Sequence, residues 1–355
     1  MPIDDVKLIV DGVAYSGWTD LDIKRSVETL SGSFRLSMVD IWGDDPITFS
    51  PNTQCSIWSG SDLLITGYLD GQKLEISPDT NIIEITGRCK TADLIDCSAN
   101  NKPASWKKGI PIVKLIGDLV APYNIKVITN SNFGNIEKEF SITTGQSVFD
   151  AISDICKDKG IVPIGTTDGK LLLTTIGPIS STDKLIYGIN IVTAEGVNNF
   201  KQRFSKYVVK GQKSGGGGSW GSKATTAIFA EAFDDNISRN RVKVITADNQ
   251  ITNSGAQKRA NWEAQVRAGR STSIRITSNE WRQSDGSLWK ENLTTFVDIP
   301  KFRAEGPMLI RTVSYRMRSN ERSIELDLVK PDIYKPEPPK KIKKKSRGNK
   351  AVWLG

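Results

Sequence analysis

Residues 33–38 read Ser33-Phe34-Arg35-Leu36-Ser37-Met38, with polar and apolar side chains in strict alternation. Successive side chains of a β-strand point to opposite faces, so this stretch predicts a strand with one face in a core. The same alternation recurs in short segments before residue 97, at Val6, Leu8 and Val10, at Leu74 and Ile76, and at Ile83 and Ile85. Turn-forming pairs separate the segments: Asp11-Gly12, Ser31-Gly32 and Asp70-Gly71. Short strands joined by tight turns are typical of an antiparallel β-barrel or sandwich.

The apolar pattern changes to a helical period between residues 98 and 180. Residues 111–120 predict a helix with Pro111 in its first turn, where the missing amide hydrogen costs nothing. Residues 147–156 predict a second helix, which Gly160 is suited to end. We therefore expect a small α+β domain in this part of the chain.

Strands resume after residue 181 and are interrupted by the glycine-rich segment 211–221. Its composition favours a flexible surface loop. A phosphate-binding role is disfavoured, because the Lys-Ser/Thr pair and the strand-to-helix setting of a P-loop are missing. A third helix is predicted from about Ala256 to Ala268, ahead of the last strands.

Two parts of the chain show a similar succession of strand, loop, strand, turn and strand. Residues 52–57, 64–69 and 82–85 follow one another as residues 292–297, 309–314 and 323–326 do. An internal duplication explains the pattern, and it predicts two β-barrels in one chain. The alternative is that any two antiparallel hairpins share such alternation.

The resulting fold class is mainly β with α+β insertions: two antiparallel β-barrels plus smaller α+β domains. The expected domains are a first barrel at 1–97, an α+β domain at 98–180, a second barrel with an inserted loop and helix at 181–330, and a basic Pro/Lys-rich tail at 331–355.

The formal net charge of +8 is concentrated in that tail. Residues 331–355 hold eight basic side chains against two acidic ones, which leaves about +2 for residues 1–330. A domain that binds nucleic acid usually has a basic face, so this distribution argues against such a function. The residues proposed to dock the tail onto an acidic partner surface are Lys340, Lys341, Lys343, Lys344, Lys345, Arg347 and Trp353. A merely solubilising tail is the alternative.

Histidine is absent from the chain, which removes the commonest general base and metal ligand. Triads of the Ser/His/Asp and Cys/His kinds are therefore excluded. The acidic pairs Asp44-Asp45 and Asp234-Asp235 lie beside turn residues, where aspartate commonly caps backbone amides, so a pair of catalytic carboxylates is disfavoured. Calcium loops with the required spacing are also missing. The sequence predicts no catalytic, cofactor-binding or metal site.

The four cysteines, Cys55, Cys89, Cys97 and Cys156, are scattered without a C-x-x-C pair, and we expect buried thiols. The nine tryptophans are spread over every segment, which favours packing and subunit contacts over the stacking of sugars or bases. No apolar run approaches the roughly 18 residues of a membrane span. The first residues, 1–5, lack the features of a secretory signal, so maturation in the cytoplasm is expected.

Residues 87–99 read Gly-Arg-Cys-Lys-Thr-Ala-Asp-Leu-Ile-Asp-Cys-Ser-Ala. This run is the most specific of several motifs that resemble the baseplate hub proteins of Mu-like contractile-tailed phages. Residues 17–26, 32–36, 145–150, 169–171 and 207–212 also match, so that the resemblance covers about residues 5–330. Similar hubs are the late control D proteins of other phages and the N-terminal part of VgrG spikes.

The resemblance implies that the two antiparallel β-barrels are tail-tube-like. It also implies a homotrimer that forms a ring between a six-fold tail tube and a three-fold central spike. Its implied partners are the spike, the tail tube and other baseplate proteins, and DNA can pass through the channel without sequence-specific binding. No cofactor or catalytic activity is implied, and the expected location is the tail baseplate of the virion. The alternatives are a tail-associated peptidoglycan hydrolase, a receptor-binding protein and a nucleic-acid-binding protein.

Overall fold

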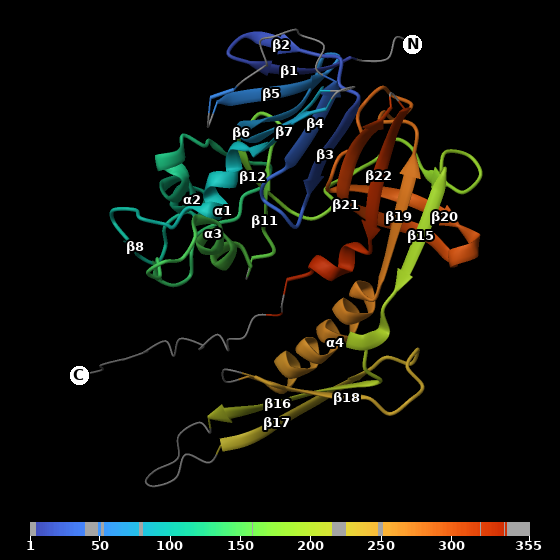
Figure 1. The fold of residues 1–355 in the computed structure, drawn as a ribbon. Helices are drawn as coiled ribbons and strands as arrows, with labels where there is room; N and C mark the ends of the chain where they lie inside the picture. The colour runs from blue at the N-terminus through green and yellow to red at the C-terminus, as the bar shows by residue number, and fades with distance from the viewer. Residues whose placement is uncertain are drawn as a thin grey trace. The chain divides into compact units, whose positions relative to one another are not determined.

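The computed structural model describes residues 5–39, 49–50, 53–77, 81–157, 159–214, 225–247, 251–319, 321–336 and 338. It divides the chain into two compact units. The first unit contains residues up to Asn198 and returns from Thr272 to Pro336, and the second is inserted between Asn199 and Ser271. Figure 1 shows the elements of both units.

Five antiparallel strands near the N-terminus form what we call the first module, in the spatial order β3-β4-β7-β6-β5. Their bounds are β3 (Asp20–Ser26), β4 (Ser33–Val39), β5 (Gln54–Ser59), β6 (Asp62–Ile76) and β7 (Asn81–Cys89). The hairpin of β1 (Val6–Val10) and β2 (Val13–Tyr15) extends the sheet beyond β5. Every second side chain of β4 is buried, as its alternation predicts.

Five strands late in the first unit form the second module, in the spatial order β15-β19-β22-β21-β20. Their bounds are β15 (Thr193–Asn198), β19 (Thr272–Ser278), β20 (Leu293–Ile299), β21 (Ala304–Arg318) and β22 (Glu321–Val329). Two short strands, β13 (Ile179–Ser180) and β14 (Leu185–Ile186), pair with β20 in parallel.

The two modules agree in strand order and in register. If the five strands of each module are numbered in chain order, their spatial order across the sheet is 1-2-5-4-3 in both modules. The fourth strands, β6 and β21, each have 15 residues. Each also carries a register shift at the matching place, between Leu69 and Gly71 in β6 and between Ile310 and Thr312 in β21. The duplicated strand pattern therefore extends to the hydrogen-bond register.

The order of the segments left open which residues of the two fourth strands correspond. Tyr68 corresponds to Leu309, since each lies two residues before the bulged position and faces the matching position of the next strand. Alternation repeats every two residues, so it cannot by itself detect a slip by an even number of positions.

The modules join edge to edge, because β3 pairs with β21 in antiparallel register. All described strands of both modules thus belong to one 14-stranded sheet. The mainly β class with small α+β parts is confirmed. The pairings among the described strands run along an open path and close neither module into a barrel. The closure of each module therefore stays a prediction.

One apolar core lies along this sheet and contains side chains from both modules. Four tryptophans of the described part of the chain are buried, as packing roles require: Trp18, Trp106, Trp281 and Trp289. Leu74 and Ile76 are an exception among the alternating positions, because both are exposed although the sequence predicts them to face a core.

The α+β domain has its own core. Its elements are α1 (Asp93–Asp96), β8 (Ser105–Trp106), α2 (Ile112–Val120), β9 (Val127–Thr129), β10 (Phe140–Ser141), α3 (Val148–Lys157), β11 (Val162–Gly165) and β12 (Leu171–Thr174). The two predicted helices are confirmed as α2 and α3, and Gly160 follows α3 in a left-handed conformation. Helices α2 and α3 pack beside the small sheet β11-β12-β9.

The second unit is a three-stranded sheet covered on one face by a helix. The strands are β16 (Lys206–Ser214), β17 (Thr225–Phe233) and β18 (Val242–Thr246), and the helix is α4 (Asn253–Arg270). Helix α4 confirms the third predicted helix, and Thr252 caps it by accepting a hydrogen bond from Gly255 N. The predicted loop at 211–221 is wrong at its start, because residues 211–214 continue β16. Its remainder lies outside the described residues.

The predicted basic tail also begins later than Pro331. Residues Pro331–Tyr334 form a 3-10 helix, and the Ile333 side chain is buried against Leu309 and Val329. Tyr334 Oη donates a hydrogen bond of 2.8 Å to Glu28. Apolar packing thus ties this segment to the second module.

Candidate assembly site

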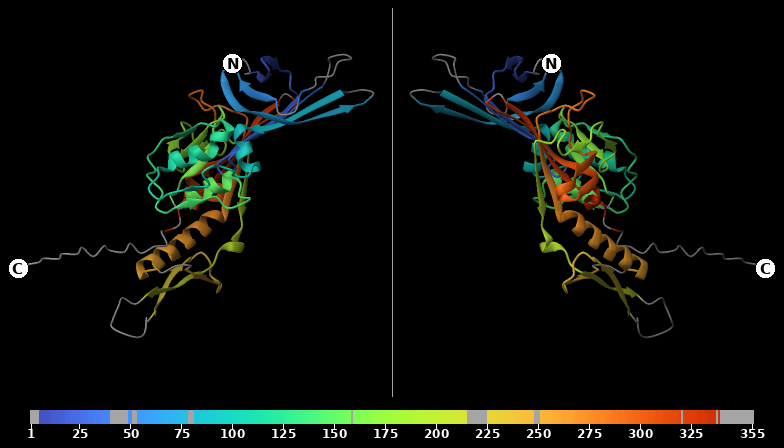
Figure 2. Two further views of the ribbon diagram at one scale, coloured as in Figure 1. Left: turned by 90° about the vertical axis from the view of Figure 1, so that its left-hand side faces the viewer. Right: turned by 90° about the vertical axis from the view of Figure 1, so that its right-hand side faces the viewer.

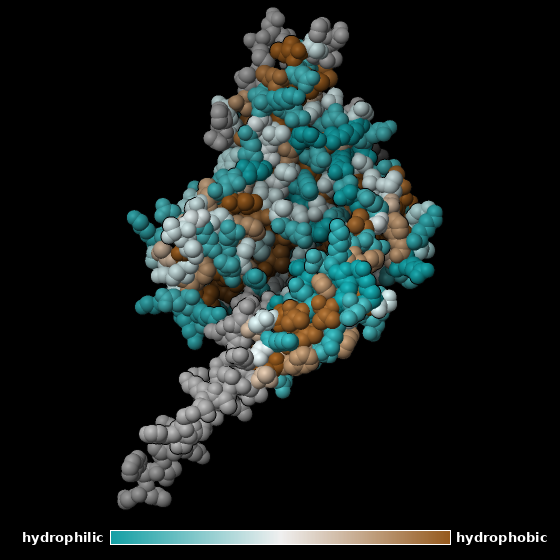
Figure 3. Space-filling model, turned by 60° about the horizontal axis from the view of Figure 1, so that its bottom comes forward, coloured by the Kyte–Doolittle hydropathy of each residue, from teal (hydrophilic) through white to brown (hydrophobic). Residues whose placement is uncertain are grey.

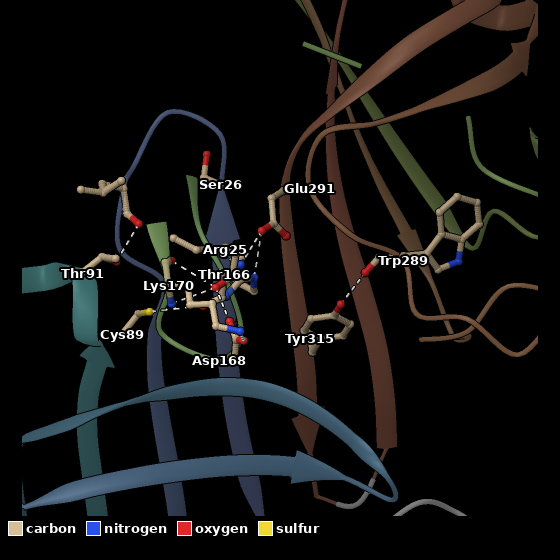
Figure 4. A network of polar contacts seen from close by, with 12 residues as sticks. Arg25, Ser26, Cys89, Thr91, Thr166, Asp168, Lys170, Trp289, Glu291 and Tyr315 are labelled. Carbon is tan, nitrogen blue, oxygen red and sulfur yellow. Dashed lines mark hydrogen bonds and ion pairs between the residues drawn. The ribbon is translucent and has the colours of Figure 1, made fainter. Parts of the chain in front are cut away.

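A buried ion pair lies where the two modules and the α+β domain meet (Figure 4). Arg25 at the end of β3 donates from Nε and Nη2 to one carboxylate oxygen of Glu291, at 3.0 and 2.6 Å. Nη2 also donates to the Gly165 carbonyl oxygen on β11, at 2.6 Å. Both charged side chains are only 7% exposed. One guanidinium therefore contacts all three parts of the first unit.

The charges of this pair are set by opposing effects. Burial alone lowers the pKa of Arg25, but the charge and hydrogen bonds of Glu291 outweigh it, so the pKa is raised and the guanidinium stays protonated. Burial, with Glu291 as a second cause, raises the pKa of Tyr315 above its ordinary value. The Tyr315 hydroxyl remains neutral and donates to the Trp289 carbonyl oxygen. The Arg25 guanidinium therefore keeps its proton, and so does the Tyr315 hydroxyl.

Close packing fixes the α+β side of this joint. Thr91 Oγ1 donates to the Leu30 carbonyl oxygen at 2.9 Å, and a Cβ at Gly165 would lie 2.5 Å from each of these two oxygen atoms. Only glycine fits there. Cys89 Sγ contacts the Thr166 carbonyl oxygen at 3.6 Å. The joint is therefore a rigid structural contact.

Sequence reasoning missed the pair of Arg25 and Glu291, because 266 positions separate them. A local signal was present. Leu21, Ile23 and Arg25 occupy the same face of one strand, and a cation in such an apolar row usually has a buried partner.

The acidic pairs show no catalytic arrangement where they are described. Asp234 Oδ1 and Oδ2 each accept a hydrogen bond of 2.8 Å from Arg203, and Oδ1 also accepts from Asn236 N at 3.2 Å. The predicted turn role is confirmed for Asp234. Asp44 and Asp45 lie outside the described residues. Within the described ranges, no group of three or more acidic or cysteine side chains could hold a metal ion.

The cysteine prediction holds for three residues and is wrong for one. Cys55, Cys89 and Cys156 are buried, and burial raises the pKa of Cys55 and of Cys156 to about 12. Cys97 is exposed, because it follows the short helix α1 at the surface of the α+β domain. The seven tail residues proposed for docking, from Lys340 to Trp353, lie outside the described residues.

The second unit presents an apolar sheet face on the side away from α4. Phe229 and Phe233 on β17 and Val242 and Val244 on β18 are its exposed members. Figure 3 shows apolar surface on this side of the unit. No helix among the described residues is both long and apolar enough to cross a membrane.

Family profiles match three parts of the chain. Residues 5–89 match the N-terminal domain of the Mu phage baseplate assembly protein GpP-like family. Residues 91–175 match the second domain of the baseplate hub protein gp44-like family, and residues 252–337 match the fourth domain of Mu phage baseplate assembly protein GpP. The chain belongs to the baseplate hub proteins of Mu-like phages.

A relative and a solved structure agree with this assignment. The hub is 29% identical over 303 residues to baseplate hub protein gp44 of Escherichia phage Mu, covering 84% of this chain and 79% of that protein. The 43 kDa tail protein of prophage MuSo2 from Shewanella oneidensis is 28% identical, with a TM-score of 0.83 over 94% of this chain and 100% of that chain. The hub is therefore a tail protein of the virion.

A more distant likeness concerns the fold alone. An E. coli component of the type VI secretion system, described as structurally similar to the T4 bacteriophage tail proteins gp27 and gp5, is 11% identical to the hub. Its TM-score is 0.55 over 91% of this chain and 76% of that chain.

Proposed function

We propose that three copies of the hub close into a ring that joins a six-fold tail tube to a three-fold central spike. The duplicated module is the observation that carries this proposal. Two modules of equal strand order and register in each of three copies would present six similar units to the tube and three identical chains to the spike. In this ring each module would curve into a tube-like barrel.

The partners in this proposal are the tail tube, the central spike and other baseplate proteins. The likeness of fold to the type VI secretion component supports a spike partner, since that protein is described as similar to the tail proteins gp27 and gp5. DNA would pass through the channel without sequence-specific contacts. Assembly would take place in the host cytoplasm.

The role is structural, and its relatives are structural tail and baseplate proteins. The buried pair of Arg25 and Glu291 supports this role, because it ties both modules to the α+β domain. The basic tail, Lys340 to Trp353, would dock onto an acidic surface of the spike or of a neighbouring baseplate subunit.

Native mass spectrometry of the full chain tests the proposed ring. The expected mass is three times that of the 39.1 kDa chain. A protein that stays monomeric at micromolar concentration contradicts the ring. Clearing of peptidoglycan in a zymogram would instead favour a hydrolase, and DNA affinity that falls steeply with salt would favour a nucleic-acid-binding protein.

A further inference from the structure

In the two modules, the outer edge of β15 and the far part of β6 lack a paired strand among the described residues. Strand β15 pairs with β19 on one side only, and five of its six residues are exposed. Strand β6 continues past the end of β5, and from Gly71 to Ile76 it pairs only with β7. Figure 2 shows this end of the β6–β7 hairpin extending away from the rest of the sheet.

These two edges correspond to the two edges that meet inside the chain. Strand β15 is the first strand of the second module, as β3 is of the first, and β6 corresponds to β21. Inside the chain β3 pairs with residues Thr312–Arg318 of β21. The matching segment of β6 begins at Gly71, since Gly71 and Thr312 both directly follow the bulge.

Burial differs between the two equivalent segments. Tyr315 and Met317 on β21 are 2% and 7% exposed, because β3 runs alongside them. Their counterparts on β6 are Leu74 and Ile76, which are 43% and 81% exposed. An exposed strand edge with apolar side chains readily pairs with another strand. The apolar alternation of β6 therefore fits a neighbouring strand that the described residues of one chain do not supply.

We propose that β15 of one copy pairs in antiparallel orientation with Gly71–Ile76 of β6 in a neighbouring copy, in the register of the β3–β21 joint. This inference rests on the proposed ring and specifies its contact between copies. Ile23 faces Tyr315 inside the chain, so Gly196, which corresponds to Ile23, faces Leu74 between copies. Val197 then faces Lys73.

The side chains of the two edges are complementary in size. Strand β15 offers Ala194 and Gly196 on the core-facing side, and β6 offers the larger Leu74 and Ile76. Pairing would bury these apolar side chains and satisfy the backbone groups of both edges. Because the two edges of a joint differ, each copy binds one neighbour through β15 and the other neighbour through β6. Only when the ring closes is neither of these two edges left unpaired in any copy.

One pair of charges differs between the two joints. Inside the chain Arg316 faces Asp22, with Nε and Oδ2 at 3.3 Å. Between copies Glu75 faces Glu195. Each glutamate has a basic neighbour on its own chain, since Lys73 lies 3.1 Å from Glu75 and Arg275 lies 3.2 Å from Glu195. These cations offset part of the repulsion.

Disulfide crosslinking tests the register. The variant Lys73→Cys/Val197→Cys, in a Cys97→Ser background, places its cysteines directly opposite each other, about 4.5–5.5 Å apart between Cα atoms and within disulfide range. Mild oxidation should yield covalent dimers and trimers on a non-reducing gel. The matched control, Lys73→Cys/Thr193→Cys, moves one cysteine four positions along β15, roughly 13 Å, and should stay uncrosslinked.

The outcomes separate this inference from the proposed ring. A native trimer without crosslinks, or with equal crosslinking in the control, overturns the strand pairing and leaves the ring intact. A monomer overturns both. Crosslinked trimers in the first variant alone support both.

A charge reversal provides an independent test. Glu75→Arg would face Glu195 and so restore the arrangement of Arg316 and Asp22. It should lower the concentration at which the oligomer dissociates by roughly three- to tenfold, measured by mass photometry. Glu139→Arg, an equal change of charge on the α+β domain, is the control and should leave dissociation unchanged. Weaker association of the Glu75→Arg variant overturns the proposed register.

Discussion

At the scale of single residues, two buried ion pairs hold the fold without contributing chemistry. Arg25 and Glu291 join the modules to the α+β domain, and Arg203 and Asp234 join the segment ahead of β16 to the turn after β17. Removing one partner of such a pair leaves an uncompensated buried charge, which costs far more than an exposed pair contributes.

Replacement of Arg25 by alanine should destabilise the first unit strongly. Glu291 and the Gly165 carbonyl would both lose their donor, and the expected loss is about 3–5 kcal/mol. Calorimetric unfolding measures it. The control is Lys114→Ala, which removes an exposed pair with Asp118 on α2 and should cost about 0.3–0.5 kcal/mol. Equal effects of the two changes would show that the Arg25 pair has no special role.

Asp234 should make the second unit sensitive to acid. Burial alone raises the pKa of Asp234, but the hydrogen bonds and charge of Arg203 outweigh it, and the pKa lies below its ordinary value. A carboxyl with a lowered pKa in the folded state stabilises the fold above its unfolded pKa of about 3.9. That contribution is lost as the pH falls through the lower, folded value.

The measurement compares melting temperatures of wild type and Asp234→Asn across the acid range. The variant should melt lower at neutral pH, and its melting temperature should fall less steeply in acid. Asp235→Asn changes the exposed neighbour and should follow wild type. A wild-type curve parallel to that of Asp234→Asn would rule out this linkage.

At the scale of elements, the sequence of the β6–β7 hairpin predicts a buried face, but the apolar side chains at its end are exposed. Its apolar alternation belongs to a strand with a covered face, yet Ile76 is largely exposed. A strong local pattern left uncovered in one chain indicates a contact with another chain.

The variant Ile76→Asp should therefore abolish association without unfolding the chain. Burying a charge at the proposed joint is unfavourable, whereas an exposed position in the monomer tolerates it. Sedimentation velocity should show monomers, with at least roughly tenfold weaker association. Val13→Asp on β2, a second exposed apolar position, is the matched control and should leave the oligomer intact. An unchanged oligomer for Ile76→Asp would contradict the contact.

At the scale of the whole molecule, one module is used twice and two further parts are added to the pair. The α+β domain follows the first module, and the unit of β16–β18 and α4 is inserted between β15 and β19. Insertion between neighbouring strands of a sheet is tolerated because the strands remain paired, as β15 and β19 do.

Truncation separates the packed part of the C-terminal segment from the basic tail. Ending the chain after Pro336 should leave the melting temperature unchanged, whereas ending it after Lys330 removes Ile333 and should cost about 1.5–3 kcal/mol. Equal melting temperatures would contradict the packing of Pro331–Tyr334.

The same truncation after Pro336 tests the docking role of the tail. Binding to the spike at low salt should weaken, because the lysine cluster is lost, and the difference should shrink as salt rises. Unchanged affinity at low salt would assign the tail a solubilising role.

The sequence by itself determined the fold class, the three long helices, the duplicated strand pattern and the family. These features depend on local periodicity and on short motifs, such as the helical spacing of residues 147–156, which neighbours along the chain specify. The prediction failed where tertiary contacts decide, at the start of the tail and at the exposed Cys97.

Only the tertiary structure decided which strands meet and in which register. The pairing of β3 with β21 and the contact of Arg25 with Glu291 join residues 266 or more positions apart in sequence. Alternation specifies which face of a strand is buried but not which strand lies beside it, because hydrogen bonds of the backbone are the same for every sequence. The edges left over by that pairing, on β15 and β6, therefore became visible only in the folded chain.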